Sequence, residues 1–107
     1  MAIMVIHDAP GFTPQDYELV RATIGWESRP PPGSFMHLLG HDADGLLNIE
    51  LWESEDLYDA YVRDRFLPAF DRLGLAHPPP PRVMFVHNAL QLEEAVDHVP
   101  RAQRTYA

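Results

Sequence analysis

The chain has 107 residues, enough for one domain with a single core, and 46% of them are hydrophobic. Its formal charge of -8 argues against nucleic acids and anionic membranes as partners, because those partners require clusters of lysine and arginine. Cysteine is absent, which excludes disulfides and thiolate nucleophiles, and no apolar run has the length of a signal sequence or membrane span, so we expect a cytoplasmic location.

The first predicted elements are a strand, a helix and a loop. Residues 2–7 form a short apolar run without polar alternation, which is typical of a strand covered on both faces. Residues 13–24 predict a helix, because Thr13 can cap its N-terminus, Pro14 suits the first helical position and apolar residues recur at helical spacing. The proline-rich segment 26–34 is expected to be a loop.

A β-hairpin is the strongest local signal in the chain. Residues 35–41 and 46–52 have strand-forming sequences, and an Asp-Gly pair at 44–45 lies between them. Antiparallel pairing places odd positions of the first strand beside even positions of the second. One face is therefore mixed and carries Phe35, His37, Leu39, His41, Leu46, Asn48, Glu50 and Trp52. The other face is aliphatic and carries Met36, Leu38, Gly40, Leu47, Ile49 and Leu51.

A long second helix follows the hairpin directly. Ser54 is a suitable N-cap, and we expect the helix to continue to residue 73. Pro68 lies inside it and predicts a kink at 64–68, because proline removes a helical hydrogen bond.

The remaining chain contains one more strand and a tail. A stiff connector at 76–81, ending in four prolines, leads to a fourth strand at 82–87. Residues 1–88 thus form the predicted domain. Residues 89–107 form a C-terminal tail, expected to contain a short helix around 91–96 and to pack on a partner subunit.

The order β-α-β-β-α-β predicts an α+β, ferredoxin-like fold, with a four-stranded antiparallel sheet and two helices on one face. The helices leave the other sheet face open, although its side chains are apolar. We therefore expect a second copy of the chain to cover it, which gives a homodimer and a dimeric α/β barrel.

The start of the second helix resembles a known family. Trp52, Glu53 and Ser54, followed by a long helix with Tyr58, resemble the dimeric α/β barrels of the antibiotic-biosynthesis-monooxygenase type. The resemblance covers residues 2–88.

A sharper resemblance is to the cofactor-free oxygenases that convert polyketide anthrones or naphthacenones into quinones. It rests on Asn48, Trp52, Tyr58 and Arg72. The resemblance implies that Asn48 and Trp52 hold a deprotonated substrate or its peroxide. It also implies that Tyr58 and Arg72 orient substrate oxygens, and that no metal or flavin is needed. Val62 stands where haem-degrading relatives carry a histidine, which argues against haem degradation.

These residues outline a candidate cavity. We expect it to be bounded by Asn48, Trp52, Tyr58, Tyr61 and Phe35, which give a largely apolar wall with a few hydrogen-bonding groups. This combination is typical of a small-molecule site.

Glu50 and His37 share the mixed face, and Glu50 departs from the oxygenase pattern by placing a carboxylate inside the predicted cavity. Two interpretations are open: a structural ion pair or hydrogen bond, or a catalytic base formed by Glu50, alone or by orienting His37. The spacing of these residues with His41 fits no familiar metal motif, so we expect no metal.

We therefore predict a cofactor-independent monooxygenase that acts on a polycyclic phenol of the polyketide type. One alternative is a non-redox cyclase or isomerase that uses Glu50 and His37 for proton transfer. Another is a non-catalytic barrel that binds a small aromatic ligand. The expected partners are a small aromatic substrate and a second copy of the chain.

Overall fold

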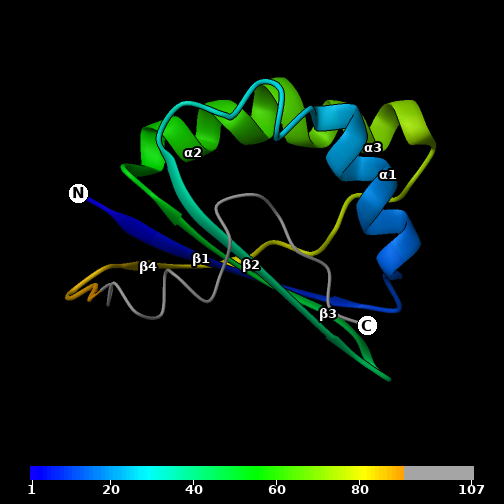
Figure 1. Ribbon diagram of the computed structural model, residues 1–107, viewed down its shortest axis with the longest axis horizontal. Helices are drawn as coiled ribbons and strands as arrows, with labels where there is room; N and C mark the ends of the chain where they lie inside the picture. The colour runs from blue at the N-terminus through cyan, green and yellow to red at the C-terminus, as the bar shows by residue number, and fades with distance from the viewer. Residues whose placement is uncertain (91–107) are drawn as a thin grey trace.

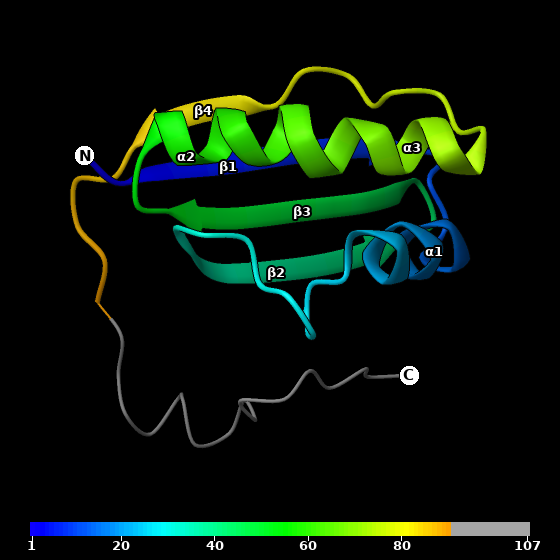
Figure 2. The same cartoon turned by 90° about the horizontal axis from the view of Figure 1, so that it is seen from above.

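A computed structural model describes residues 1–90, in which helices cover one face of an antiparallel four-stranded sheet (Figure 1; Figure 2). The strands are β1 (Ile3–Pro10), β2 (Ser34–Asp42), β3 (Gly45–Trp52) and β4 (Arg82–Phe85), in the sheet order β2-β3-β1-β4. The helices are α1 (Pro14–Ile24), α2 (Glu55–Tyr61) and α3 (Leu67–Leu73), with the π-helical segment η1 (Val62–Phe66) between the last two. The predicted α+β, ferredoxin-like fold is confirmed. The helix predicted at 91–96 lies outside the described residues.

The hairpin of β2 and β3 has the predicted pairing. Asp42 pairs with Gly45 across a two-residue turn, and His37 pairs with Glu50. Odd positions of β2 thus lie beside even positions of β3, as the sequence predicts. A β-bulge interrupts this rule at the start of β2, where the paired positions step from Ser34 directly to Met36.

Strand β1 lies in the middle of the sheet and is longer than predicted. It pairs with β3 from Ile3 to Pro10, so the segment after residue 7 continues the strand. Gly45 permits this extension, because its φ is 143° and a Cβ atom there would lie 2.5 Å from the carbonyl oxygen of Ala9. Strand β4 is shorter than predicted and ends at Phe85.

Both long helices begin at the predicted caps. Thr13 and Asp16 form a capping box at α1, where the backbone N–H of Asp16 donates to the Thr13 hydroxyl at 3.1 Å. Ser54 accepts a hydrogen bond from the backbone N–H of Leu57 at 3.2 Å and so caps α2. These caps fix where each helix starts over the sheet.

In the segment where a kink was predicted, near Pro68, the structure has a π-helix. The backbone N–H of Leu67 donates to the carbonyl of Val62, a five-residue step instead of the four-residue step of an α-helix. Pro68 has no N–H to donate, so a regular α-helical bond to the carbonyl of Asp64 cannot form. The segment η1 absorbs this defect and joins α2 to α3.

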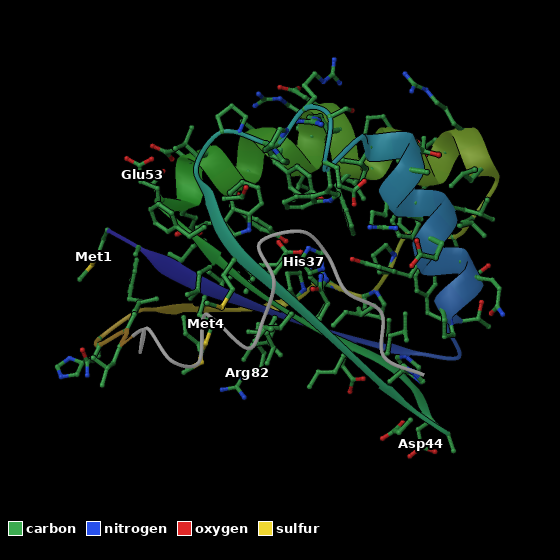
Figure 3. The ribbon with its side chains drawn as sticks, viewed as in Figure 1. Met1, Met4, His37, Asp44, Glu53 and Arg82 are labelled. Atoms are coloured by element: carbon green, nitrogen blue, oxygen red, sulfur yellow. The ribbon has the colours of Figure 1, made fainter. Side chains whose placement is uncertain are left out.

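The core lies between the helices and the sheet. Its buried members are Ile3, Val5, Val20, Ile24, Trp52, Tyr58, Tyr61, Ala69 and Phe70. Figure 3 shows His37 on this helical side, with Met4 and Arg82 on the opposite side of the sheet. None of the helices in residues 1–90 is both long and apolar enough to span a bilayer.

Candidate active site

A cavity opens between the helical layer and the middle of the sheet. Its volume is about 60 Å³, room for a few water molecules, whereas ligand sites typically measure roughly 300–1,000 Å³. The polar residues that line it come from strands β1, β2 and β3 and from helices α1 and α2. They are His7 from β1, His37 from β2, Asn48 and Glu50 from β3, Tyr17 and Arg21 from α1, and Tyr61 from α2. Aromatic and aliphatic side chains form most of the remaining wall.

Glu50 is the most deeply buried polar residue of this cavity, with 1% of its surface exposed. Its Oε2 accepts a hydrogen bond from Asn48 Nδ2, and its Oε1 accepts one from Trp52 Nε1, both at 2.7 Å. The alternation of β3 produces this arrangement, because residues 48, 50 and 52 project from the same face of the strand. The three residues therefore form one unit with the carboxylate at its centre.

Burial raises the pKa of the Glu50 carboxyl, and the hydrogen bonds from Trp52 and Asn48 oppose this rise without cancelling it. Each carboxylate oxygen has a second lone pair, so Glu50 can still accept a proton from a bound molecule. A carboxyl with a raised pKa in an apolar cavity has the properties of a general base.

His37 lies beside Glu50, as its register position on β2 predicts. Burial lowers the pKa of His37 to about 4, and the positive charges of His7, when it is protonated at low pH, and of Arg21 act in the same direction. The ring is therefore neutral at neutral pH. Its Nε2 lies 3.5 Å from the hydroxyl of Tyr17, so the carboxylate and the imidazole have different hydrogen-bond partners.

The sequence analysis missed His7, which lines the cavity from β1 and pairs directly with Asn48. Its Nε2 lies 3.1 Å from the hydroxyl of Tyr58. The signal that could have found His7 is the parity of β1. Its odd positions are the apolar, helix-facing residues, and His7 interrupts them with a polar ring.

Aromatic rings surround the carboxylate on the helical side. The rings of Trp52 and Tyr61 are 4.9 Å apart, and Trp26 lies 5.4 Å from Tyr61 and 5.1 Å from His37. Burial and the charge of Glu50 raise the pKa of Tyr61, so its phenol stays neutral. Trp26 was predicted only as part of a loop, yet it supplies one wall of the cavity.

Three residues to which the resemblance gives roles in substrate binding have hydrogen-bond partners within the chain. Asn48 Nδ2 and Trp52 Nε1 both donate to Glu50, so these donors hold a carboxylate of the chain itself. Tyr58 is buried, but its hydroxyl contacts His7 and its side chain does not line the cavity. Tyr61 does line the cavity, as expected.

Two predicted substrate-binding residues lie outside the cavity. Phe35 is 65% exposed, because the β-bulge removes it from the alternation on which the prediction depended. Arg72 is exposed near the end of α3. Its predicted position beside Tyr58 assumed a regular α-helix, and the extra residue of a π-helical turn rotates later positions by roughly 100°.

The fold defines the class of protein: a ferredoxin-like α+β domain with a candidate site between helices and sheet. Neither a family sequence model nor a curated protein sequence matches the chain.

Three solved structures have a similar fold. SnoaB, a cofactor-independent oxygenase from Streptomyces nogalater, is 21% identical over 83% of this chain and 95% of its own, with a TM-score of 0.57. The monooxygenase from the gene ActVA-Orf6 of Streptomyces coelicolor, in complex with nanaomycin D, is 24% identical over 86% and 92%, with a TM-score of 0.52. A proposed antibiotic biosynthesis monooxygenase from Chloroflexus aurantiacus is 16% identical over 84% and 95%, with a TM-score of 0.53.

These neighbours are of the antibiotic-biosynthesis-monooxygenase type that the sequence resembles, and at this level of identity the likeness shows the fold.

Proposed function

We propose that the chain is a cofactor-independent oxygenase that uses Glu50 as a general base on a phenolic aromatic substrate. The observation that supports this most strongly is the buried carboxylate, held by Asn48 and Trp52 on the wall of an apolar cavity. Flat rings can stack on the aromatic wall, and the substrate is then positioned for proton transfer.

The proposed reaction begins when Glu50 removes a proton from an acidic carbon of the ring system. The electron pair of the broken C–H bond is delocalised over the conjugated rings, and this electron-rich anion is the species that reduces O₂. Over the whole reaction, a methylene carbon and O₂ become a carbonyl and one water molecule. General-base catalysis by a positioned carboxylate contributes about 10²–10⁴ in rate.

The fold relatives support the choice of substrate class. SnoaB is a cofactor-independent oxygenase, and the Streptomyces coelicolor monooxygenase was solved with nanaomycin D. A polycyclic molecule needs more room than the cavity of about 60 Å³ offers, so lining side chains must move when it binds.

The test is oxygen uptake and quinone absorbance with an anthrone-type substrate and metal-free protein. We expect turnover by the wild type and a loss of about 10²-fold or more in Glu50→Gln. Glu53→Gln is the matched control, because Glu53 is exposed and lies three residues further along the chain. Wild-type protein that gives only the uncatalysed rate would exclude this substrate class.

A second candidate is a non-redox isomerase or cyclase. The donors of Asn48 and Trp52 are engaged by Glu50, an arrangement that serves proton transfer whether or not oxygen follows. Exchange of substrate hydrogen for deuterium by the wild type, lost in Glu50→Gln and without oxygen uptake, would favour this candidate.

A further inference from the structure

His7 and Tyr58 form a buried pair that proton removal by Glu50 alone does not explain. His7 is 7% exposed and lines the cavity, and its Nε2 lies 3.1 Å from the Tyr58 hydroxyl. Among the described residues, the other ring nitrogen, Nδ1, is buried and has no hydrogen-bond partner. Buried polar atoms are almost always paired, so this nitrogen marks a place where a bound molecule would supply the partner.

The direction of the hydrogen bond between His7 and Tyr58 sets which ring nitrogen carries the proton. Burial lowers the pKa of His7 and raises the pKa of Tyr58, so both groups are neutral near pH 7. A neutral imidazole has one N–H and one acceptor nitrogen. In the described part of the chain, the hydroxyl of Tyr58 has His7 Nε2 as its hydrogen-bond partner. When Tyr58 donates to Nε2, the His7 proton lies on Nδ1, which becomes a donor.

The sheet places this donor close to the base. His7 on β1 pairs with Asn48 on β3, and Glu50 is the diagonal neighbour two residues along the same face. Such diagonal positions are separated by roughly 7–8 Å. One flat conjugated molecule can therefore contact both side chains, with its acidic C–H at Glu50 and an oxygen at His7.

We propose that His7, oriented by Tyr58, donates its Nδ1–H to the substrate oxygen that becomes negative when Glu50 removes the proton. The inference rests on the proposed base and specifies the substrate class: a C–H acid conjugated to a carbonyl or phenol oxygen. The proton moves to Glu50, the C–H electron pair moves onto the conjugated oxygen, and no oxidant takes part in this step. His7 is then a catalytic residue and Tyr58 a positioning residue.

The experiment uses para-nitrophenol as a probe of the oxyanion, because its phenolate absorbs at longer wavelength than the neutral phenol. It is carried out without oxygen in the Glu50→Gln protein, which represents the site after Glu50 has taken up the proton. We expect the bound probe to ionise at lower pH than the free probe. Adding His7→Phe should reduce the ionisation constant of the bound probe about tenfold or more. Adding Tyr58→Phe should give an intermediate value, because the ring loses the partner that fixes its tautomer.

His41→Phe is the matched control, since it removes an exposed imidazole that does not line the cavity and should change the ionisation less than twofold. If His7→Phe does not fold, His7→Asn and His7→Ala give the same comparison. The asparagine side chain keeps an N–H donor and should preserve the shift, and alanine should abolish it. The proposal is overturned if the ionisation is unchanged without the His7 donor, if His41→Phe has an equal effect, or if the probe does not bind at millimolar concentration. Because oxygen is excluded, a negative oxygenase assay does not affect this result.

Discussion

Glu50 lowers the stability of the fold and supplies the candidate site with a carboxylate. A buried carboxylate is destabilising unless it is hydrogen-bonded, and here both oxygens have donors from the same strand. The pKa of the group is still raised, because two neutral donors replace only part of the lost hydration. Stability given up in this way is common where a residue is retained for its chemistry.

Glu50→Gln should therefore stabilise the protein by about 0.5–2 kcal/mol at pH 8 while it removes the base. The glutamine oxygen can accept from Trp52 Nε1, and its amide can donate to Asn48 Oδ1, which is buried without a partner among the described residues. The wild-type fold binds a proton at Glu50 more readily than the unfolded chain, so its stability rises as pH falls through the raised pKa. Urea unfolding should show the gap between variant and wild type narrowing towards pH 5, with Glu53→Gln matching the wild type throughout.

His37 should give the opposite pH dependence. Its pKa is about 4 in the folded chain and about 6.5 when unfolded, so the unfolded chain takes up a proton first as the pH falls. Its contribution to stability is lost progressively between pH 6.5 and 4, up to roughly 3 kcal/mol in total. His37→Phe should flatten the fall in unfolding free energy between pH 7 and 4.5, and His41→Phe, an exposed position on the same strand, should not. Equal slopes in His37→Phe and wild type would contradict the assignment.

At the level of elements, η1 connects the helical layer to the loop over the site. Arg65 on this segment donates through its guanidinium to the carbonyl of Ile24 at 2.7 Å and to that of Arg29 at 2.6 Å. It therefore joins η1 to the end of α1 and to the segment that carries Trp26. The next residue, Phe66, contacts the ring of His7 at 5.6 Å. The π-helical turn thus places Arg65 against the segment that carries Trp26 and places Phe66 against His7.

Arg65→Met should lower the free energy of unfolding by about 1.5–3 kcal/mol, because two charged hydrogen bonds to backbone carbonyls are lost. It should also increase amide hydrogen exchange in residues 26–33. Arg63→Met is the control, since Arg63 is on the same segment, is largely exposed and pairs with its neighbour Asp64. That variant should stay within about 0.5 kcal/mol of the wild type. Chemical denaturation measures both variants. Equal losses of unfolding free energy would show that the hydrogen bonds from Arg65 to the carbonyls of Ile24 and Arg29 do not account for the loss.

The elements also explain which parts of the site the sequence could reveal. Strand parity has a period of two and depends little on turn length, so Glu50, Asn48 and His37 were placed on the correct face. A bulge or a π-turn shifts the count by one residue, and no single residue type signals either. Phe35 and Arg72, whose predicted positions depended on a count across these irregularities, therefore lie outside the cavity.

His7 and Trp26 were missed for another reason. Their roles depend on contacts between segments far apart in the chain, such as the pairing of β1 with β3. Local periodicity carries no information about which strand lies in the middle of a sheet. The fold class, by contrast, follows from the order of elements alone and was predicted in full.

At the scale of the whole molecule, the sheet has one face that the helices do not cover (Figure 1). Apolar side chains on it are substantially exposed: Met36 at 38%, Leu38 at 52%, Leu47 at 43% and Met84 at 41%. A contiguous apolar surface of this kind is unusual for a monomer and is typical of an interaction surface. A second copy of the chain would bring an identical face to it, and the two faces would match by symmetry. The homodimer therefore remains our prediction for this surface.

Leu38→Asp tests the dimer, because it places one charge from each copy within the proposed interface, where desolvation and repulsion both oppose association. We expect light scattering at micromolar concentration to give twice the mass of one chain for the wild type and a single-chain mass for Leu38→Asp. Leu19→Asp is the matched control, since Leu19 is 53% exposed on α1, away from this face, and should leave the dimer intact. An obligate interface should bury more than about 2,000 Å² in total, enough that one chain alone leaves a large apolar area in water. A single-chain mass for the wild type, or dissociation of Leu19→Asp alone, would show that something other than a second copy covers the sheet.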